Sequence, residues 1–192
     1  MKKNIIILFL LSFLFSGNIN AQTSDSTKIV SIIENFFEWY VEVIKEEAYP
    51  EYSPQFVEDE NGNTTLDYSL YMNNLKKLSF SKELIEQEKK AYESCIENLL
   101  EVKYTMFDSV FDELDDYETA QCDFFNSYRW IGSMELIDGV NVKEVITESE
   151  KGEVKLQFYN YYPKDSAFYY WNSSTSIFLL KENNEWKINK IE

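Results

Sequence analysis

The stretch VKLQFYNYYPKDSAFYYW, residues 154–171, decides how the second half of the chain folds. Up to residue 162, apolar and polar side chains alternate, with Val154, Leu156 and Phe158 on one face and lysine, glutamine and tyrosine on the other. A period of two is typical of a β-strand with one buried face. The segment PKDSA predicts a turn, and FYYW begins a return strand. The stretch therefore predicts a β-hairpin.

Eight of the 14 residues from 158 to 171 are aromatic. Half of these rings belong to the predicted core face, whereas the tyrosines of the other face could form a cross-strand ladder, a rim or a platform for stacking a sugar. Tyrosine and tryptophan favour strands in any case, and an aromatic pair stabilises a hairpin by roughly 0.5–1.5 kcal/mol. We therefore favour a structural role for these rings.

Further strands are expected on both sides of this hairpin. Val140, Val142 and Ile146 are expected to share one face of the preceding strand, and a three-residue loop at 150–152 closes the turn. The predicted register pairs Ile146 with Leu156, Glu144 with Phe158, and Val142 with Asn160. Two later strands follow, around residues 175–181 and around Trp186 and Ile188.

Helices are predicted throughout the first half. The longest covers residues 26–47 and carries an apolar stripe at helical spacing: Ile29, Ile32, Ile33, Phe36, Tyr40 and Val43. Others are expected at 67–78 with Asp67 as N-cap, at 81–102 with Ser81 as N-cap, and at about 106–114. Asn61-Gly62 predicts a small hairpin turn. Helices followed by antiparallel strands define an α+β fold class, with N-terminal helices packed in a curved sheet of four or more strands.

The chain begins MKKNIIILFLLSFLFSGNINAQ. Two lysines precede an apolar run from Ile5 to Phe15, and small and polar residues lead to the Ala21–Gln22 junction. This order is typical of a secretory signal peptide, and the run is too short for a membrane-spanning helix. We therefore expect residues 1–21 to be removed and residues 22–192 to form one domain in the periplasm or outside the cell.

The chain is strongly acidic. It has 18 basic and 34 acidic residues and a net charge of −16, which becomes −18 when Lys2 and Lys3 leave with the signal peptide. Such a charge repels nucleic acid and anionic membranes, so we expect neither as a partner. A protein partner would be basic, although the charge could also serve only to keep an exported protein soluble.

Histidine is absent, which removes the usual general base and zinc ligand. The acidic stretch around Gly62 does not match a calcium loop, because Val57 would take the first ligand position. We therefore expect no metal and no cofactor. Cys95 and Cys122 could form a disulfide in an oxidising compartment or could both be small core residues, and the sequence leaves both possibilities open.

The first helix, VSIIENFFEWYVEVI, is so bulky that a sheet must enclose it, and the chain ends in the hairpin FLLKENNEWKINKIE. These features resemble the nuclear transport factor 2-like superfamily, a cone of curved sheet wrapped around helices. The segments FFEWYV, LDYSLYMNNLKKLSFSKELI and CDFFNSYRW look most like an uncharacterised bacterial extracytoplasmic family within that fold. The resemblance implies a half-barrel sheet. Catalytic members of the superfamily use Asp with His or Tyr inside the cone.

Two carboxylates are candidates for a general base. Glu144 is expected on the same strand face as Val142 and Ile146, where an aromatic cavity would raise the pKa of its carboxyl. Asp123 is the second candidate, with a tyrosine as the proton donor. A frayed, wet strand edge would instead make Glu144 an ordinary surface residue.

Arg129 is the only arginine in the chain. Its planar guanidinium can grip a carboxylate with two hydrogen bonds or stack on a ring, which lysine does less well. Asp123 could be its partner in a structural pair, or Arg129 could be an ordinary surface residue. At the border of the cone, Arg129 would be the first candidate for binding a carboxylate-bearing ligand. Tyr40, Trp130 and Asn160 are the other candidate ligand contacts, although we prefer core packing as the explanation of Tyr40.

Two functions follow from these features. The first is a non-catalytic binding or interaction domain, for a small apolar or amphipathic ligand or for a basic protein. The alternative is a small isomerase- or hydrolase-type enzyme that uses Glu144 or Asp123 as general base.

Overall fold

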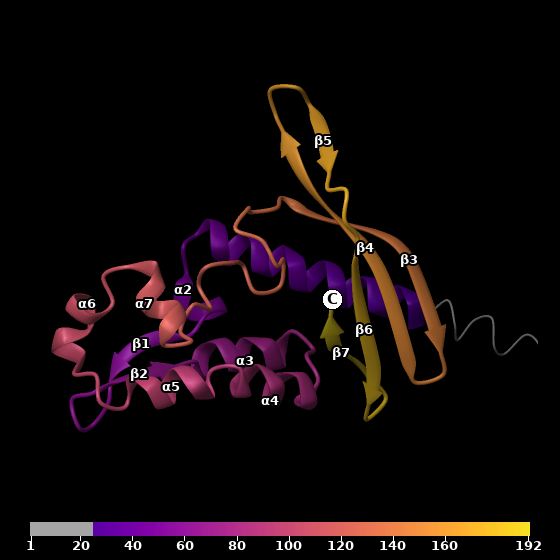
Figure 1. The fold of residues 1–192 in the computed structure, drawn as a ribbon. Helices are drawn as coiled ribbons and strands as arrows, with labels where there is room; N and C mark the ends of the chain where they lie inside the picture. The colour runs from indigo at the N-terminus through magenta and orange to yellow at the C-terminus, as the bar shows by residue number, and fades with distance from the viewer. Residues whose placement is uncertain (1–24) are drawn as a thin grey trace, which may run out of the picture.

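The structure is a computed structural model that describes residues 25–192, so the predicted signal peptide, residues 1–21, lies outside the described residues. It is an α+β fold in which helices precede an antiparallel sheet of five strands (Figure 1). This order of helices and strands confirms the predicted fold class. Within residues 25–192, no helix has both the length and the apolar character needed to cross a membrane.

A long first helix covers residues 25–45, close to the predicted 26–47. Its apolar stripe is buried against the sheet, which it crosses in Figure 1. Phe37 packs edge-on against Phe158 of the sheet at 5.6 Å between ring centroids. Ile29 fits so closely above Gly152 that a Cβ at residue 152 would lie 2.8 Å from its Cδ1 atom. The sheet therefore packs on the apolar face of the first helix.

The remaining helices are short. They are α2 Tyr49–Tyr52, α3 Ser69–Lys77, α4 Lys82–Lys90, α5 Glu93–Leu99, the 3-10 helix η1 Tyr104–Met106, α6 Phe107–Val110 and α7 Leu114–Thr119. Ser81 caps α4 as predicted, because its hydroxyl accepts a 3.0 Å hydrogen bond from the Leu84 N–H. The predicted helix over 81–102 is interrupted between α4 and α5. The predicted cap Asp67 lies one residue too early, since Tyr68 is the N-cap of α3.

The predicted hairpin around Asn61-Gly62 is present. Its strands are β1 Gln55–Glu58 and β2 Thr64–Asp67, which form a separate two-stranded sheet. The carboxylate of Asp59 accepts hydrogen bonds of 2.8 Å from the backbone N–H groups of Asn61 and Asn63. The acidic loop is therefore organised by its own backbone.

The main sheet contains β3 Gly139–Glu148, β4 Lys151–Tyr162, β5 Ala167–Tyr170, β6 Thr175–Glu182 and β7 Glu185–Ile191. The strand order is β3-β4-β6-β7, all antiparallel, and β5 pairs with the outer part of β4. Backbone hydrogen bonds of 2.8 Å from Ser81 to Ile188 and from Ile188 to Ser79 join β7 to the start of α4. The sheet and the helical half thus share one core.

The predicted register between β3 and β4 is wrong. Val142 pairs with Leu156, Glu144 with Lys155, and Ile146 with Glu153. The turn contains only two residues, with Ser149 in the left-handed region at φ 55°, and a bulge lies between Val142 and Glu144. An odd shift of register moves every side chain to the opposite face of a strand. Glu144 and Ile146 therefore face outward.

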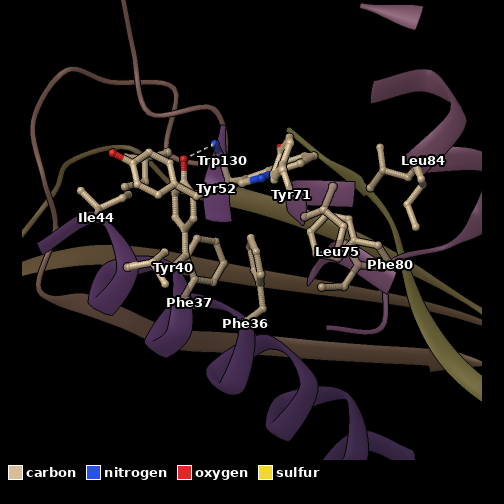
Figure 2. Close-up of a cluster of buried hydrophobic side chains, with 14 of the residues drawn as sticks. Phe36, Phe37, Tyr40, Ile44, Tyr52, Tyr71, Leu75, Phe80, Leu84 and Trp130 are labelled. Atoms are coloured by element: carbon tan, nitrogen blue, oxygen red, sulfur yellow. Dashed lines mark hydrogen bonds between the residues drawn. The ribbon is translucent and has the colours of Figure 1, made fainter. Parts of the chain in front are cut away.

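An aromatic cluster fills the space between the first helix and the rest of the molecule (Figure 2). Phe36 is central, with its ring 4.8 Å from Phe37, 4.9 Å from Phe80 and 6.2 Å from Trp130. Rings from the first helix, from the start of α4 and from the segment before β3 thus meet at one point. This cluster positions Trp130, and with it the neighbouring Arg129.

The hairpin of β4 and β5 projects away from the body of the molecule (Figure 1). Tyr159 lies between Phe168 and Tyr170 across the hairpin, at centroid distances of 5.3 and 5.9 Å. Tyr162 and Tyr169 pair on the other face at 5.0 Å. These tyrosines form a cross-strand ladder, one of the three arrangements left open by the sequence. The prediction that half of the eight rings lie in the core is wrong: only Phe158 is buried, because the hairpin projects from the body of the molecule.

Candidate functional site

A pocket of about 570 Å³ opens between the end of the first helix, α2 and the segment before β3. Five tyrosines and one arginine contribute to its lining: Tyr40, Tyr49, Tyr52, Tyr92, Tyr128 and Arg129. Both polar and aromatic groups line it, as in many sites for small molecules. It is therefore the candidate binding site.

Arg129 enters this pocket with one edge of its guanidinium already engaged. Its Nη2 lies 2.8 Å from Oε2 of Glu88, and its Nε donates to the same carboxylate at 2.9 and 3.1 Å. The Glu88 side chain is fully buried, whereas 50% of the Arg129 side chain is exposed. The guanidinium also lies over the ring of Trp130, 5.3 Å from its centroid. The buried carboxylate therefore fixes the orientation of a half-exposed cation.

Glu88 has two further partners. The hydroxyls of Tyr71 and Tyr92 donate to its Oε1 at 3.0 and 2.5 Å. Burial, and then the negative charge of Glu88, raises the pKa of both tyrosines, so both hydroxyls stay protonated and able to donate. The buried carboxylate thus receives hydrogen bonds from three side chains, which compensates it for the loss of water.

Two further tyrosines that line the pocket, Tyr40 and Tyr52, are neutral as well. Burial raises the pKa of Tyr52 to about 12, and it raises that of Tyr40 further. The Tyr40 hydroxyl accepts a long, 3.5 Å hydrogen bond from the Trp130 backbone N–H (Figure 2). This contact links the first helix to the segment that carries Arg129.

The charges around the pocket are almost balanced. Burial lowers the pKa of Arg129, but the hydrogen bonds and charge of Glu88 outweigh that effect, so the guanidinium stays protonated. Lys45 forms an ion pair with Asp138, with 2.6 Å between Nζ and Oδ1. Glu47, also at the pocket, forms no ion pair within residues 25–192. The balance of charge is therefore slightly negative.

A tight turn presents Arg129. The backbone N–H of Tyr128 donates to the Ser133 carbonyl at 2.8 Å, and the Gly132 N–H returns to the Tyr128 carbonyl at 2.8 Å. Gly132 has a φ of 67°, in the left-handed region that glycine adopts without steric cost. Backbone geometry thus places the arginine at the pocket wall.

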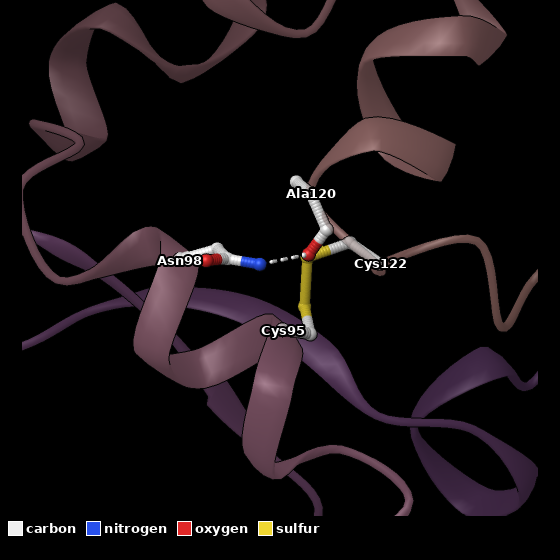
Figure 3. The surroundings of a disulfide bond; sticks show 4 residues. All are labelled: Cys95, Asn98, Ala120 and Cys122. Carbon is white, nitrogen blue, oxygen red and sulfur yellow. Dashed lines mark hydrogen bonds between the residues drawn. A yellow bond between two sulfur atoms is a disulfide. The ribbon is translucent and has the colours of Figure 1, made fainter.

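A disulfide between Cys95 and Cys122 anchors the start of the same segment to α5 (Figure 3). Both cysteines have 0% exposure, and the bridge spans 27 residues of sequence. Beside it, the Asn98 side-chain amide donates to the Ala120 carbonyl at 3.0 Å. The two possibilities left open by the sequence are thus resolved in favour of pairing.

The predicted partner of Arg129 is wrong. Asp123 is exposed, and Arg129 pairs with Glu88. The prediction that Glu144 faces an aromatic cavity is also wrong: half of its side chain is exposed, and its partner is Lys155 at 2.9 Å. The shift in register explains this position, and neither carboxylate lines the pocket.

The other candidate contacts surround the pocket at different depths. Tyr40 lines its wall, whereas Trp130 is buried beneath Arg129. Asn160 lies outside the lining, where its side-chain amide donates to the Leu136 carbonyl at 2.8 Å and accepts from the Trp171 indole at 2.8 Å. It supports Leu136, which does line the pocket.

Sequence reasoning missed Glu88, the residue that fixes Arg129. It lies in the charged run KELIEQEKK, which is typical of a solvated helix face. Its position was nevertheless informative, because it falls four residues after Leu84 and four before Tyr92 on the apolar stripe. A single charge on an apolar helical stripe needs a buried partner.

Comparison with known proteins finds no matching family model, no similar curated protein and no similar solved structure. Within residues 25–192, no group of three or more His, Cys, Asp or Glu side chains is placed to hold a metal ion. The argument about function therefore rests on the geometry of the pocket.

Proposed function

We propose that this protein is a secreted or periplasmic, non-catalytic binding domain that holds a small amphipathic ligand in the Arg129 pocket. One observation carries the proposal: a half-exposed guanidinium is fixed on a fully buried carboxylate at the wall of a tyrosine-lined pocket. A group oriented before the ligand arrives loses less entropy on binding.

Two further features support the assignment. A disulfide is typical of an oxidising compartment, which agrees with export directed by the predicted signal peptide. The order of helices and sheet supports the proposed relationship to the nuclear transport factor 2-like superfamily. Because both expected general bases lie at the surface, binding is preferred to catalysis.

The proposal is tested by native mass spectrometry of protein purified from the exported fraction. We expect a small molecule to remain bound to the wild type and to the control Lys155→Ala, which changes an ion pair on the outer face of the sheet. Arg129→Lys keeps a positive charge beside the buried Glu88, so it should stay folded, but it loses the planar guanidinium and should lose the ligand. Wild-type protein that carries no molecule, and that takes up none from a cell extract, would contradict the proposal.

A specific observation also favours a basic protein partner as a second candidate. Glu34, Glu38, Glu42 and Glu46 repeat every four residues along the first helix, beside a groove of about 660 Å³. None of them forms an ion pair with another residue in the range 25–192. Like charges at this spacing destabilise a helix slightly, so a binding function would explain why four of them stand here.

This candidate has its own test. A partner captured from the exported fraction at low salt should be lost at high salt and lost with Glu38→Lys/Glu42→Lys. Capture that is unchanged by both treatments would rule out the four glutamates of the first helix as the binding surface.

A further inference from the structure

We infer that the ligand of the Arg129 pocket is a neutral, hydroxyl-rich ring compound, that is, a saccharide unit, and not an anion. The inference rests on the proposed function and names the ligand class for the same pocket. It is built on the charge balance of the pocket, on its exposed rings and on its unpaired polar groups.

Charge argues against an anion. The positive charge of Arg129 is already compensated by Glu88 at 2.8 Å, and that of Lys45 by Asp138 at 2.6 Å. Glu47 adds an uncompensated negative charge at the pocket, on a chain whose net charge is −16. An incoming carboxylate would give up its hydration and find no net positive potential. A neutral ligand avoids this cost.

Exposed rings provide surfaces for stacking. Tyr49 of α2 is 53% exposed and Phe125 is 44% exposed, and both line the pocket together with Tyr128. Single large apolar side chains are common on surfaces, but here rings from two separate segments border one pocket. The C–H faces of a pyranose pack against aromatic rings, which have an apolar, electron-rich face.

The polar groups match hydroxyls better than a carboxylate. Within the described residues, Arg129 Nη1, the side-chain amide of Asn126 and the hydroxyl of Ser127 have no hydrogen-bond partner, and all three residues line the pocket. They offer both donors and acceptors, as does the Tyr128 hydroxyl. A carboxylate ligand can only accept, whereas each sugar hydroxyl both donates and accepts.

The guanidinium has a suitable geometry for such a ligand. Glu88 occupies the edge formed by Nε and Nη2, so the two N–H groups of Nη1 and the second N–H group of Nη2 remain for the ligand. Two N–H groups in one plane match the oxygens of neighbouring ring hydroxyls. Lysine in the same position would keep the charge but lose this fixed plane.

The test is a titration of the ¹⁵N-labelled exported protein with three kinds of probe, followed by NMR. The first kind is a panel of neutral methyl glycosides and disaccharides, the second is glucuronate and benzoate, and the third is phenol as a neutral aromatic without a sugar ring. We expect at least one neutral sugar to give saturable shifts in residues 124–136, with an affinity that does not change with salt.

Variants then assign the binding to this pocket. Asn126→Ala, Tyr128→Ala and Arg129→Lys should each weaken the sugar by about tenfold or more, which corresponds to about 1.4 kcal/mol. Lys155→Ala, on the outer face of the sheet, should bind as the wild type does.

Three outcomes would overturn the inference. Salt-sensitive binding of only glucuronate and benzoate would identify an anion site, and binding of only phenol would identify an aromatic site; either result leaves the proposed binding function standing. If no probe shifts these residues, the saccharide assignment falls, whereas the ligand retained on exported protein decides the broader proposal separately.

Discussion

Two ion pairs of this protein have almost the same length and opposite surroundings. Arg129 and Glu88 are 2.8 Å apart beside the helical half, and Lys155 and Glu144 are 2.9 Å apart on the outer face of the sheet. Glu88 is fully buried, whereas both members of the second pair are about half exposed. The distance between two charges therefore says little about the role of an ion pair until the water around it is known.

The difference lies in what replaces water. Glu88 receives hydrogen bonds from Tyr71 and Tyr92 in addition to the two from Arg129 Nε. Glu144 receives one from Lys155 and keeps its contact with solvent. A buried ion pair need not stabilise a fold compared with apolar residues, but removing one member leaves the other without a partner. The buried pair can thus orient a binding group, which the exposed pair cannot do.

The largest expected effect comes from removing the buried carboxylate. Glu88→Ala leaves the Arg129 charge and two buried tyrosine hydroxyls without an acceptor, so we expect a loss of about 3–5 kcal/mol in the free energy of unfolding. Glu144→Ala, the matched control, should cost less than about 1 kcal/mol. Urea denaturation of both variants measures the two values.

Glu88→Gln tests the role of charge separately, because the amide preserves shape and one acceptor oxygen. It should unfold more easily than the wild type and less easily than Glu88→Ala. Equal losses for Glu88→Ala and Glu144→Ala would show that burial does not distinguish the two pairs, and the comparison would fail.

Some elements of the fold could be predicted from the sequence, and the position of Glu144 could not. The Ser81 cap, the first helix and the aromatic hairpin depend on local patterns, and they were predictable for that reason. The position of Glu144 was not, because a bulge and a two-residue turn change the register without any strong local signal. Alternation correctly predicted that Val154, Leu156 and Phe158 of β4 are buried, but it cannot locate a bulge, and the bulge after Val142 reverses the faces of β3.

The candidate site was predictable only in part. Arg129 stood out as the only arginine, but its partner lies 41 residues away in sequence, beyond the reach of local spacing. Asp123 was the nearer carboxylate and the wrong one. Glu88 carried a usable signal on the apolar stripe of its helix, whereas the pocket itself depends on the packing of three distant segments.

The second-largest effect is expected from loss of the disulfide, which should disturb the region around Arg129 more than the region around Glu144. Replacing Cys95 and Cys122 by alanine removes a cross-link of 27 residues and should lower the free energy of unfolding by about 2–4 kcal/mol. The segment that carries Arg129 follows Cys122 directly, so NMR signals near Arg129 should broaden or shift. Signals around Glu144 should stay in place; if they change equally, the bridge stabilises the whole molecule rather than the pocket side.

The smallest effect belongs to an ion pair of intermediate exposure. Asp138 is 32% exposed, accepts a hydrogen bond from Lys45 at 2.6 Å and accepts another from the Tyr161 backbone N–H at 2.9 Å. The hydrogen bond from Lys45, followed by that from Tyr161, lowers the pKa of the Asp138 carboxyl below its usual value of 3.8. Because the folded state holds this carboxylate ionised, its stabilising contribution is present above the usual pKa and is lost as the pH falls through the lowered one.

Asp138→Asn should therefore cost less than about 1 kcal/mol at neutral pH, given the partial exposure of the pair. The difference from wild type should shrink as the pH falls below about 4 and vanish in stronger acid, where the carboxyl is protonated in both states. Urea midpoints measured across this range for both proteins would show the convergence. A difference that stays constant with pH would mean that the shape of the side chain at residue 138, and not its charge, stabilises the contact between the first helix and β4. In that case exposure alone would not rank the three ion pairs.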